Sequence, residues 1–534
     1  MSARSISSIC DRDGTTEPPR PTDKWECLRC EEIFEFPRGQ RQPLSCPNPN
    51  CQKRGPFKAL TGPWVYFIGL EKFVPKLLAD DILKEHHFAT HRDSWIIYHY
   101  HDGYYSPGGE AIIREICREM LGELAKERHV SEVISHIRDI TFTAPEKFIA
   151  PVEFLCVKNG VLNTRTKELM PHTPDIIFMQ KLLIDYNPSA KCPMIMKRMA
   201  EWTNTKGIVG LLQFAGFCLY RNYFIRKALI LYGEGSNGKT TLVLFLVNWL
   251  GQDNVSDVKV QNLEKRFYTV KLFGKLANIC DDLPGNEWFG TGSFKQATGG
   301  SPLDGEKKFK DSFSFTSYAK MLFTGNRMPI VNDDTMAFWD RIYLIPFQTR
   351  FDGSMNRQNI LEGMLTDEEK SGFLNLALLG LDTLLKSGSF YLAEDIEKTK
   401  AQYIKISDPV MAFAHEKIIE SPLSRVLKSD VYAAYVDYCV ELGFPVKENN
   451  AFSRSFKRIY PRMDETQITT ESGKHPTAWV GIDLAPVVVP DEAPITPAED
   501  TRDTNVSVYI ELLSAISLYD IKVREKPSEP LKPS

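Results

Sequence analysis

The feature that most constrains the fold of this chain is a glycine-rich loop at residues 233–240, which reads GEGSNGKT. A short apolar run, KALILY, precedes it, and a helical pattern, TLVLFLVNWL, follows it. The loop matches the pattern G-x-x-x-x-G-K-[ST] in the strand, loop and helix context that this pattern requires. A chance glycine-rich turn is the alternative, but motif and context together favour a nucleoside triphosphate site.

The chemistry of the loop assigns each residue a role. Glycines let backbone N–H groups approach the phosphates, and the helix N-terminus faces their negative charge. Lys239 would reach the β- and γ-phosphates, and Thr240 would offer its hydroxyl to Mg²⁺. The predicted ATP-binding residues are Gly233, Glu234, Gly235, Ser236, Asn237, Gly238, Lys239, Thr240 and Thr241. Hydrolysis is a separate function and needs further groups.

Acidic groups beside the phosphates are expected at the end of a second apolar run, LANIC at 276–280, which leads into Asp281 and Asp282. One carboxylate would hold Mg²⁺ while the other orients the attacking water. We assign Asp281 to the metal and Asp282 to the water. The alternative is a strand that ends in a polar turn, because a Pro-Gly pair follows.

Two more polar residues would complete a set for hydrolysis. A third apolar run, KMLFTGN, ends at Asn326, whose amide would bond the γ-phosphate or the attacking water. The carboxyl ends of strands are where open α/β sheets place ligand groups, although a lone Asn is usually a turn former. Arg341 precedes a fourth apolar run in MAFWDRIYLIPF. It is either a surface arginine or an arginine finger that reaches the nucleotide of a neighbouring subunit.

A charged segment, DGEKKFKD at 304–311, lies between the acids and Asn326. Asp304-Gly305 predicts a turn, and the strand-like SFSFTSYAKMLF follows. Lysines there would meet phosphates, and an aromatic ring would press against a sugar or base. The residues expected to contact DNA are Lys307, Lys308, Phe309 and Lys310. The alternative is a solvated hairpin tip.

The order of these segments, GEGSNGKT, LANICDD, GGSPLDGEKKFK, MLFTGN and WDRIYLIPF, resembles the superfamily 3 helicases. It is most similar to the phage and plasmid primase-helicase group that includes the poxvirus-type primase-helicases, over residues 80–485. The resemblance implies an α/β, AAA+-type P-loop core in a hexameric ring, with ATP held between subunits. It also implies that the hairpin around Lys307–Lys310 lines a central channel, with Asn326 as sensor and Arg341 as arginine finger. Residues 1–60 are too few for a polymerising primase core, so priming is not expected.

Four cysteines near the N-terminus have metal-ligand spacing. Cys27-x₂-Cys30 is followed by Cys46-x₄-Cys51, which suits a tetrahedral Cys₄ zinc site. The second pair is wider than the usual knuckle. A segment with so little apolar content needs a metal crosslink of this kind to fold, so unliganded cysteines are the weaker alternative. The partner of this zinc ribbon is nucleic acid or protein.

The C-terminal part reads as helix, helix, hairpin. KSDVYAAYVDYCVELG at 428–443 is helical with Ser429 or Asp430 as N-cap, and Asn450 would cap AFSRSFKRIYPR. The apolar face of the second helix would hold Phe452, Phe456 and Ile459. A strand pair around residues 472–474 follows. This arrangement resembles the winged helix at the end of the same group, with DNA contacts from Arg454, Lys457, Arg458 and Lys474. A protein-binding winged helix is the alternative.

Composition limits the class of protein. Hydrophobic residues make up 43% and charged residues 25%, as in globular proteins, and the net charge of −4 restricts DNA binding to local patches. No apolar run is long enough for a membrane span, and no secretory signal opens the chain. We therefore expect a soluble, cytoplasmic protein of a prokaryotic or virus-infected cell. The expected domains are a disordered 1–20, a zinc ribbon 21–60, a helicase-associated domain 61–205, an ATPase core 206–385, a winged helix 386–485, and a linker and tail 486–534.

These parts predict an ATP-dependent, ring-forming DNA helicase in the replication of a virus, plasmid or integrated element. ATP, Mg²⁺ and structural Zn²⁺ are the expected cofactors. The expected partners are single-stranded DNA in the channel, duplex DNA at the winged helix, further copies of the chain, and a separate primase or polymerase. The alternative is a DNA-binding initiator that uses ATP only as an assembly switch. A small-molecule kinase would explain neither the winged helix nor the zinc site.

Overall fold

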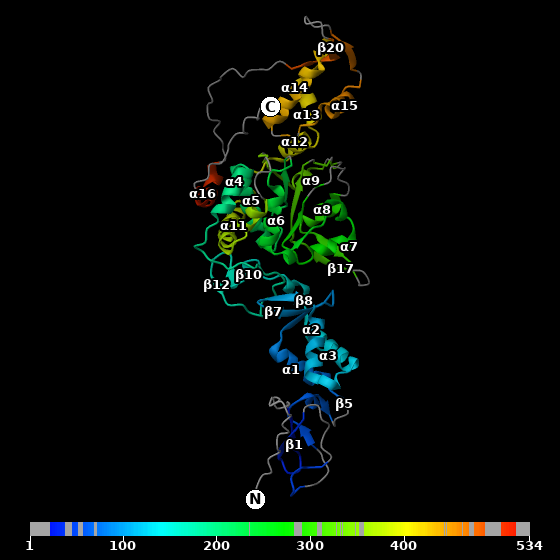
Figure 1. Ribbon diagram of the computed structural model, residues 1–534, viewed down its shortest axis with the longest axis vertical. Helices are drawn as coiled ribbons and strands as arrows, with labels where there is room; N and C mark the ends of the chain where they lie inside the picture. Colours follow the sequence, from blue (N-terminus) through cyan, green and yellow to red (C-terminus); the bar gives the residue numbers. More distant parts are fainter. Residues whose placement is uncertain are drawn as a thin grey trace, which may run out of the picture. The chain divides into compact units, whose positions relative to one another are not determined.

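The structure of the chain is a computed structural model that divides into two compact units, Met1–Phe148 and Ile149–Ser534 (Figure 1). It describes residues 22–37, 45–51, 57–68, 72–233, 235–281, 283, 291–306, 312–326, 328–329, 331, 333, 335–347, 349–351, 357–442, 444, 446–461, 463–468, 475–485 and 503–519. The division between residues 148 and 149 falls inside the predicted 61–205 domain, so the bounds of that domain stay a prediction. Within the described ranges, no helix has both the length and the apolar character that crossing a membrane needs.

The described part of the first unit holds three sheets, in which every strand pair except β6 with β9 is antiparallel. Strand β1 pairs with β2 and β3 in a small sheet, and the larger sheet has the order β8-β7-β6-β9. A tight turn with positive φ at Asp102 and Gly103 joins β7 to β8, as the twist of a hairpin favours. The elements are β1 (Thr22–Cys27), β2 (Ile33–Pro37), β3 (Phe57–Ala59), β4 (Phe67–Ile68), β5 (Lys72–Phe73), α1 (Pro75–Glu85), β6 (Phe88–His91), β7 (Ile97–His101), β8 (Tyr104–Pro107), α2 (Gly109–Leu121), α3 (Glu127–Ile140) and β9 (Phe142–Thr143).

The second unit is built on a five-stranded parallel sheet with the order β14-β15-β18-β13-β19. Every residue of β13, β15 and β18 is buried, as in parallel sheets covered on both faces. The four predicted apolar runs are therefore confirmed as strands. The sheet comprises β13 (Ala228–Tyr232), β14 (Val255–Ser256), β15 (Ala277–Cys280), β18 (Lys320–Gly325) and β19 (Ile342–Pro346).

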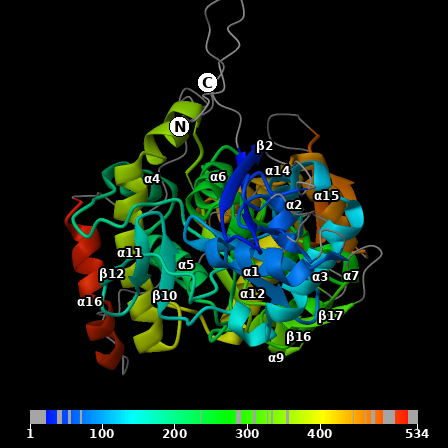
Figure 2. The ribbon, with the colours of Figure 1, turned by 90° about the horizontal axis from the view of Figure 1, so that it is seen from below.

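Helices of the second unit pack against this sheet and against each other. Helix α5 crosses α11 so closely that a Cβ on Gly216 would lie 2.1 Å from the carbonyl oxygen of Ala377, and one on Gly380 would lie 2.6 Å from that of Leu212. Helix α16 lies alongside α11 (Figure 2) and buries Leu512 there. The bounds are β10 (Phe154–Val157), β11 (Gly160–Asn163), β12 (Leu169–Met170), α4 (Pro193–Trp202), α5 (Thr205–Leu219), α6 (Lys239–Leu250), α7 (Arg266–Thr269), α10 (Arg357–Met364), α11 (Asp367–Ser387) and α16 (Asp503–Ser517).

A hairpin leaves the sheet between β15 and β18. Helix α8 (Thr291–Ala297) leads into β16 (Pro302–Gly305), which pairs antiparallel with β17 (Phe313–Thr316). The prediction that Asp304-Gly305 forms the turn is wrong, because both residues pair within the hairpin, with Ser314 and Phe313. The tip, with Lys307, Lys308, Phe309 and Lys310, lies outside the described residues.

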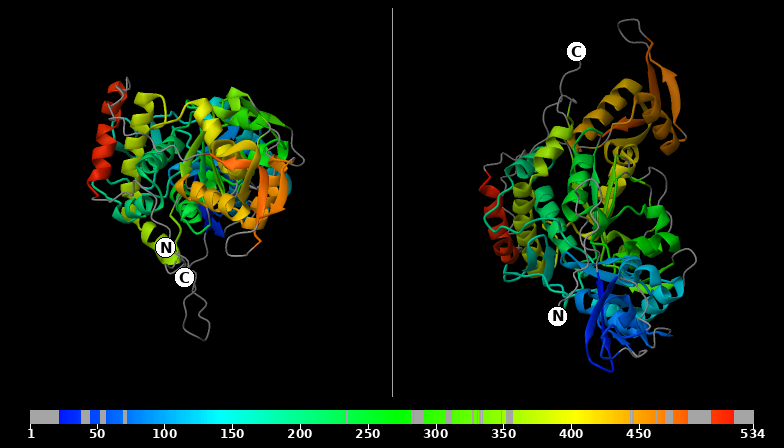
Figure 3. Two further views of the ribbon diagram at one scale, coloured as in Figure 1. Left: turned by 90° about the horizontal axis from the view of Figure 1, so that it is seen from above. Right: turned by 60° about the horizontal axis from the view of Figure 1, so that its bottom comes forward.

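The C-terminal part of the second unit combines helices with a three-stranded sheet of order β20-β22-β21 (Figure 3). The two predicted helices and the hairpin are present, but β20 was not predicted. The helix starts differ, because Ser429 and Asp430 lie inside the first turn of α14, and Asn450 lies inside that of α15. The elements are α12 (Ile396–Ser407), α13 (Pro409–Lys417), β20 (Ile418–Leu427), α14 (Lys428–Leu442), α15 (Asn449–Ile459), β21 (Asp464–Gln467) and β22 (Thr477–Leu484).

Candidate functional site

The glycine-rich loop connects the carboxyl end of β13 to the first turn of α6. Three of its described residues have positive φ: Gly233 at 149°, Ser236 at 62° and Gly238 at 92°. A Cβ on Gly238 would lie 2.4 Å from Nε1 of Trp202, so only glycine fits both the backbone angle and the space. The loop turns sharply here, and α6 begins at Lys239 with its free N–H groups facing the loop.

The Lys239 ammonium lies inside this loop. Its Nζ donates to the carbonyl oxygen of Gly233 at 2.7 Å and to Oδ1 of Asn237 at 2.9 Å. Asn237 in turn donates from Nδ2 to the carbonyl oxygen of Phe347 at 2.8 Å. Lys239 is only 5% exposed, so its charge is poorly screened by water. An anion that enters the loop would therefore meet a buried, prepositioned cation.

Two of the predicted polar residues lie at the same edge of the sheet as the loop. Asp281 follows β15, and its Oδ1 accepts a hydrogen bond from Oγ1 of Thr324 on neighbouring β18 at 2.5 Å. Asn326 follows β18 directly, and both Asp281 and Asn326 are exposed. A carboxylate beside the Thr240 hydroxyl offers the hard oxygen ligands that Mg²⁺ prefers, so the donor set fits this ion. Asp282 and Glu234 lie outside the described residues.

The loop, Asp281, Thr324 and Asn326 line one cavity of about 390 Å³, a volume within the usual range for small-molecule sites. Sequence reasoning missed the residues that complete its wall. These are Arg198, Glu201, Trp202, Phe351 and Ile360. No periodicity distinguished them from an ordinary amphipathic helix and its packing partners.

The missed wall is both aromatic and charged. Trp202 is 3% exposed, and its ring stacks near that of Phe347, with centroids 6.4 Å apart and planes inclined by 26°. One turn earlier on α4, Arg198 forms an ion pair with Glu201 at 2.6 Å. Such a wall offers apolar surface to a flat ligand ring and polar groups to the edge of that ring.

Arg341 lies away from this cavity. It immediately precedes β19, and its carbonyl oxygen accepts from the N–H of Ala228 at the start of β13. The loop follows the other end of β13, roughly 16 Å away at about 3.3 Å per strand residue. The guanidinium is 8% exposed; its Nε donates to Oγ1 of Thr298 at 3.0 Å and its Nη1 to the carbonyl of Ala337. Burial, and next the nearby guanidinium of Arg226, lower the pKa of Arg341.

The four N-terminal cysteines lie together in the first unit. Their sulfur atoms are all within 4.8 Å of one another, with Sγ–Sγ distances of 3.6 Å for Cys30 and Cys46 and 4.0 Å for Cys27 and Cys51. A tetrahedral ZnS₄ centre with bonds of about 2.3 Å requires sulfur separations of about 3.8 Å. The residues therefore fit zinc. A hydrogen bond from the backbone N–H of Arg29 lowers the pKa of Cys27 to about 7, whereas burial raises the pKa of Cys46 to about 12, so Cys27 forms the thiolate more readily than Cys46.

The basic residues of α15 face away from its buried side. Phe452 and Phe456 are buried, whereas Arg454, Lys457 and Arg458 are exposed. Lys457 pairs with Glu465 on β21 at 2.9 Å, and Glu465 also pairs with Lys428. These two lysines lower the pKa of Glu465 to about 2. The surface formed by Arg454, Lys457 and Arg458 is thus less basic than the sequence of α15 alone indicates. Lys474 lies outside the part of the chain that the structure describes.

Two family matches fall between α1 and Arg341. Residues 76–204 match the family described as "D5 N terminal like", and residues 231–341 match a "Family of unknown function (DUF5906)". The second match contains the glycine-rich loop, Asp281, Asn326 and Arg341. It therefore spans all the described residues predicted for ATP binding and hydrolysis.

The chain is also similar to two viral proteins. It is 23% identical over 262 residues to "Putative helicase 121R" of Invertebrate iridescent virus 3, which is 46% of this chain and 27% of that protein. It is 27% identical over 149 residues to "Putative helicase L207/L206" of Acanthamoeba polyphaga mimivirus, which is 26% of this chain and 15% of that protein. The chain thus spans about a quarter or less of these relatives.

Among solved structures, the apo C-terminal region of NrS-1 aligns with 77% of this chain and the whole of that chain, at 12% identity and a TM-score of 0.40. A second apo structure of the same region aligns at 14% identity and a TM-score of 0.38.

Proposed function

We propose that this chain, which belongs to the phage and viral primase-helicase family, is an ATP-driven DNA helicase. The observation that carries the proposal is the convergence of the glycine-rich loop, Asp281 and Asn326 on one cavity. These residues come from three strands that are adjacent in the sheet but distant in sequence. A parallel sheet with β18 between the loop strand and the acid strand supports an AAA+-type core.

The cavity suits ATP as substrate. The loop N–H groups and Lys239 would bind the β- and γ-phosphates, and the base would lie against Trp202, Phe351 and Ile360. Thr240 and Asp281 would hold Mg²⁺, which when bound neutralises charge on the β- and γ-phosphate oxygens. Arg198 and Glu201 would read the edge of the base.

Hydrolysis follows from what the polar residues can hold. Water attacks the γ-phosphorus while the bond to the β,γ-bridging oxygen breaks, which leaves ADP and inorganic phosphate. Asn326 would hold the γ-phosphate or the water, and Asp282 would orient the water and accept its proton. Arg341 lies at the opposite edge of the sheet from its own cavity, so we assign it to the nucleotide of a neighbouring subunit. This assignment requires a ring of subunits, for which the family resemblance implies six.

DNA binding is assigned to the hairpin β16–β17 and to the C-terminal module. The hairpin lies between the Mg²⁺ ligand Asp281 and the sensor Asn326 in the sequence, and β17 leads into β18, the strand that Asn326 follows, so the hairpin would respond to the nucleotide through that strand. We propose a winged-helix role for α14, α15 and the β21–β22 pair, with Arg454 and Arg458 on phosphates. The Cys₄ cluster would hold structural Zn²⁺.

The experiment that tests the proposal is strand displacement on forked DNA, with ATP and with a non-hydrolysable analogue. A helicase displaces the strand only with ATP, whereas an initiator that uses ATP as an assembly switch binds DNA with either nucleotide and displaces nothing. Turnover of ATP without displacement in any DNA geometry would contradict the helicase proposal and favour the initiator.

A further inference from the structure

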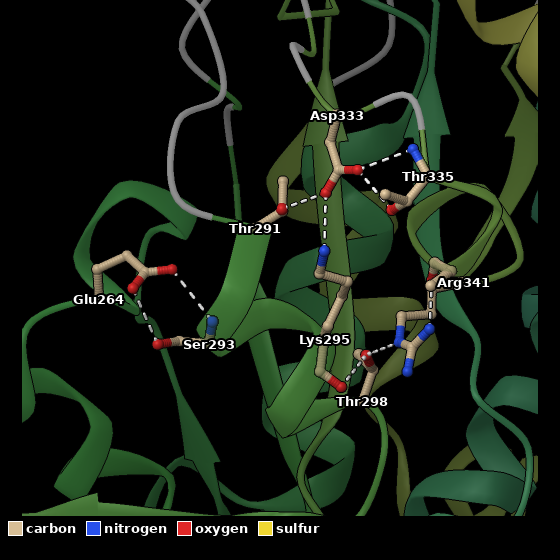
Figure 4. Close-up of polar contacts among 9 residues, drawn as sticks. Glu264, Thr291, Ser293, Lys295, Thr298, Asp333, Thr335 and Arg341 are labelled. Carbon is tan, nitrogen blue, oxygen red and sulfur yellow. Dashed lines mark hydrogen bonds and ion pairs between the residues drawn. The ribbon is translucent and has the colours of Figure 1, made fainter.

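A largely enclosed carboxylate outside the nucleotide cavity accepts hydrogen bonds at both of its oxygens. One oxygen of Asp333 accepts from Oγ1 of Thr291 and from Nζ of Lys295, the latter at 2.9 Å (Figure 4). The other accepts from the backbone N–H of Thr335 at 2.9 Å and from its hydroxyl. The side chain is 10% exposed. Four donors around one carboxylate form a rigid junction, because charge-assisted hydrogen bonds are the strongest kind.

The charge state of this junction follows from its donors. Burial alone would raise the pKa of Asp333, but the hydrogen bonds from Thr291, Thr335 and Lys295 together lower it well below its ordinary value. The carboxylate is therefore ionised at neutral pH. A neutral amide of the same shape would present an NH₂ group where donors already point, so the junction would lose part of its hydrogen bonding.

Two of the four donors belong to α8, and other contacts fix the same helix. Thr291 and Lys295 lie one turn apart on α8, and Ser293 between them bonds to the carboxylate of Glu264 through its N–H at 3.1 Å and its hydroxyl at 3.2 Å (Figure 4). Two carboxylates from distant segments thus hold one short helix. The helix is also anchored in the core by Phe294 and Ala297, so the two carboxylates fix its outer side.

The other end of α8 leads to two functional elements. Thr298 follows the last residue of the helix; its hydroxyl donates to the carbonyl of Phe294 and accepts from Nε of Arg341 at 3.0 Å. The chain then turns at Gly299-Gly300 and enters β16 at Pro302. A shift of α8 would therefore move both the guanidinium of Arg341 and the base of the hairpin.

We infer that Asp333 is a positioning residue: by holding α8, it sets the place of Arg341 and of the β16–β17 hairpin relative to the loop that follows Asn326. The inference rests on the proposed function. Asp333 lies in the segment that leaves the cavity edge at Asn326, yet it is not among the described residues that line the cavity. In the sequence it follows Asn326 by seven residues, and by its contacts it belongs with α8.

The expected effect is a loss of rate without a loss of nucleotide affinity. In Asp333→Asn, DNA-stimulated kcat should fall by about 10- to 100-fold, because misplacing a catalytic group by about 1 Å costs that much. KM for ATP should stay within about twofold, since no cavity contact changes. Thr298→Val, which keeps the shape but removes the hydroxyl, should reproduce the effect, and the double variant should be no worse than the stronger single variant.

The test uses the full chain and three readouts: ATP turnover with forked DNA, strand displacement, and amide hydrogen exchange of α8 and β16. Asp257→Asn is the matched control, because Asp257 is 84% exposed and pairs only loosely with Lys271 at 3.8 Å. The inference predicts faster exchange in α8 and β16 for Asp333→Asn and unchanged behaviour for the control.

The outcomes separate this inference from the proposed function. If the wild-type chain hydrolyses ATP and Asp333→Asn has the same kcat, the positioning role of Asp333 is overturned while the proposed function stands. Additive losses in the double variant, or a rise in KM with unchanged exchange of α8, overturn it as well. A wild-type chain without ATP turnover overturns the proposed function, and the positioning role in hydrolysis falls with it.

Discussion

Replacing Lys239 with alanine removes the buried cation of the glycine-rich loop. At about 4 Å from a phosphate oxygen and an effective dielectric constant of about 20, one charge pair contributes about 4 kcal/mol. Since each 1.36 kcal/mol is a factor of ten, kcat/KM for ATP should fall by about 10³-fold. The Lys239 side chain is 5% exposed, so solvent screens this charge pair little.

The same change also affects the nucleotide-free protein. Lys239→Ala leaves the carbonyl of Gly233 and Oδ1 of Asn237 without their ammonium donor. Losing these two bonds should lower the free energy of unfolding by about 1 to 3 kcal/mol in total. This cost is too small to explain a 10³-fold loss of activity in a chain that remains folded at the assay temperature.

The assay is phosphate release across a range of ATP concentrations, with thermal unfolding measured on the same preparations. Lys206→Ala is the matched control, because Lys206 pairs with Glu394 at 2.8 Å and lies outside the cavity wall. The control should keep wild-type turnover. Normal turnover in Lys239→Ala would refute the assignment of the loop as the phosphate site.

The remaining predictions concern other parts of the chain. Arg341→Ala should keep nucleotide binding but lose hydrolysis, and mixing it with Asp282→Asn subunits should restore some turnover; no rescue at any ratio would contradict a role across subunits. Trp202→Ala should raise KM for ATP by about tenfold or more, because it removes the ring that packs against Gly238 and so loosens the phosphate loop; an unchanged KM would contradict a role of Trp202 in the cavity wall. Cys51→Ser, or chelation of the metal, should release one zinc per chain and unfold the region around β1 while the second unit keeps its thermal transition; a chain that holds no zinc when purified with zinc would refute the Cys₄ site.

The central sheet was predictable because its strands are apolar and end in polar residues. The runs before Gly233, Asp281 and Asn326 and the run after Arg341 all became neighbouring parallel strands. Burial on both faces makes such strands continuous apolar segments, which a sequence displays directly. The Cys₄ cluster was predictable for a similar reason, since metal ligands keep their spacing.

Other parts of the structure could not be predicted from the sequence, because they depend on contacts between distant segments. Trp202 reads as an ordinary apolar helix residue until the fold brings it against Gly238. The Asp333 junction joins α8 to a segment far along the chain, and neither strand nor helix periodicity carries that information. At Asp304-Gly305, local turn preference gave the wrong answer because pairing with β17 extends the strand.

The ion pair between Lys457 and Glu465 gives the same lesson about charge. The α15 sequence counts as strongly basic, yet part of that charge is neutralised by a residue on β21. The charge of a segment can be counted from its sequence, but the electrostatic field of a surface sums the charges of all segments that meet there.

The most direct test of the account is strand displacement by the wild-type chain on forked DNA, compared with Lys239→Ala under the same conditions. The account predicts displacement that requires ATP hydrolysis and disappears in the variant, while the variant still binds DNA. Displacement that persists in Lys239→Ala, or its absence from a wild-type chain that hydrolyses ATP, would contradict the claim that this nucleotide site drives DNA movement.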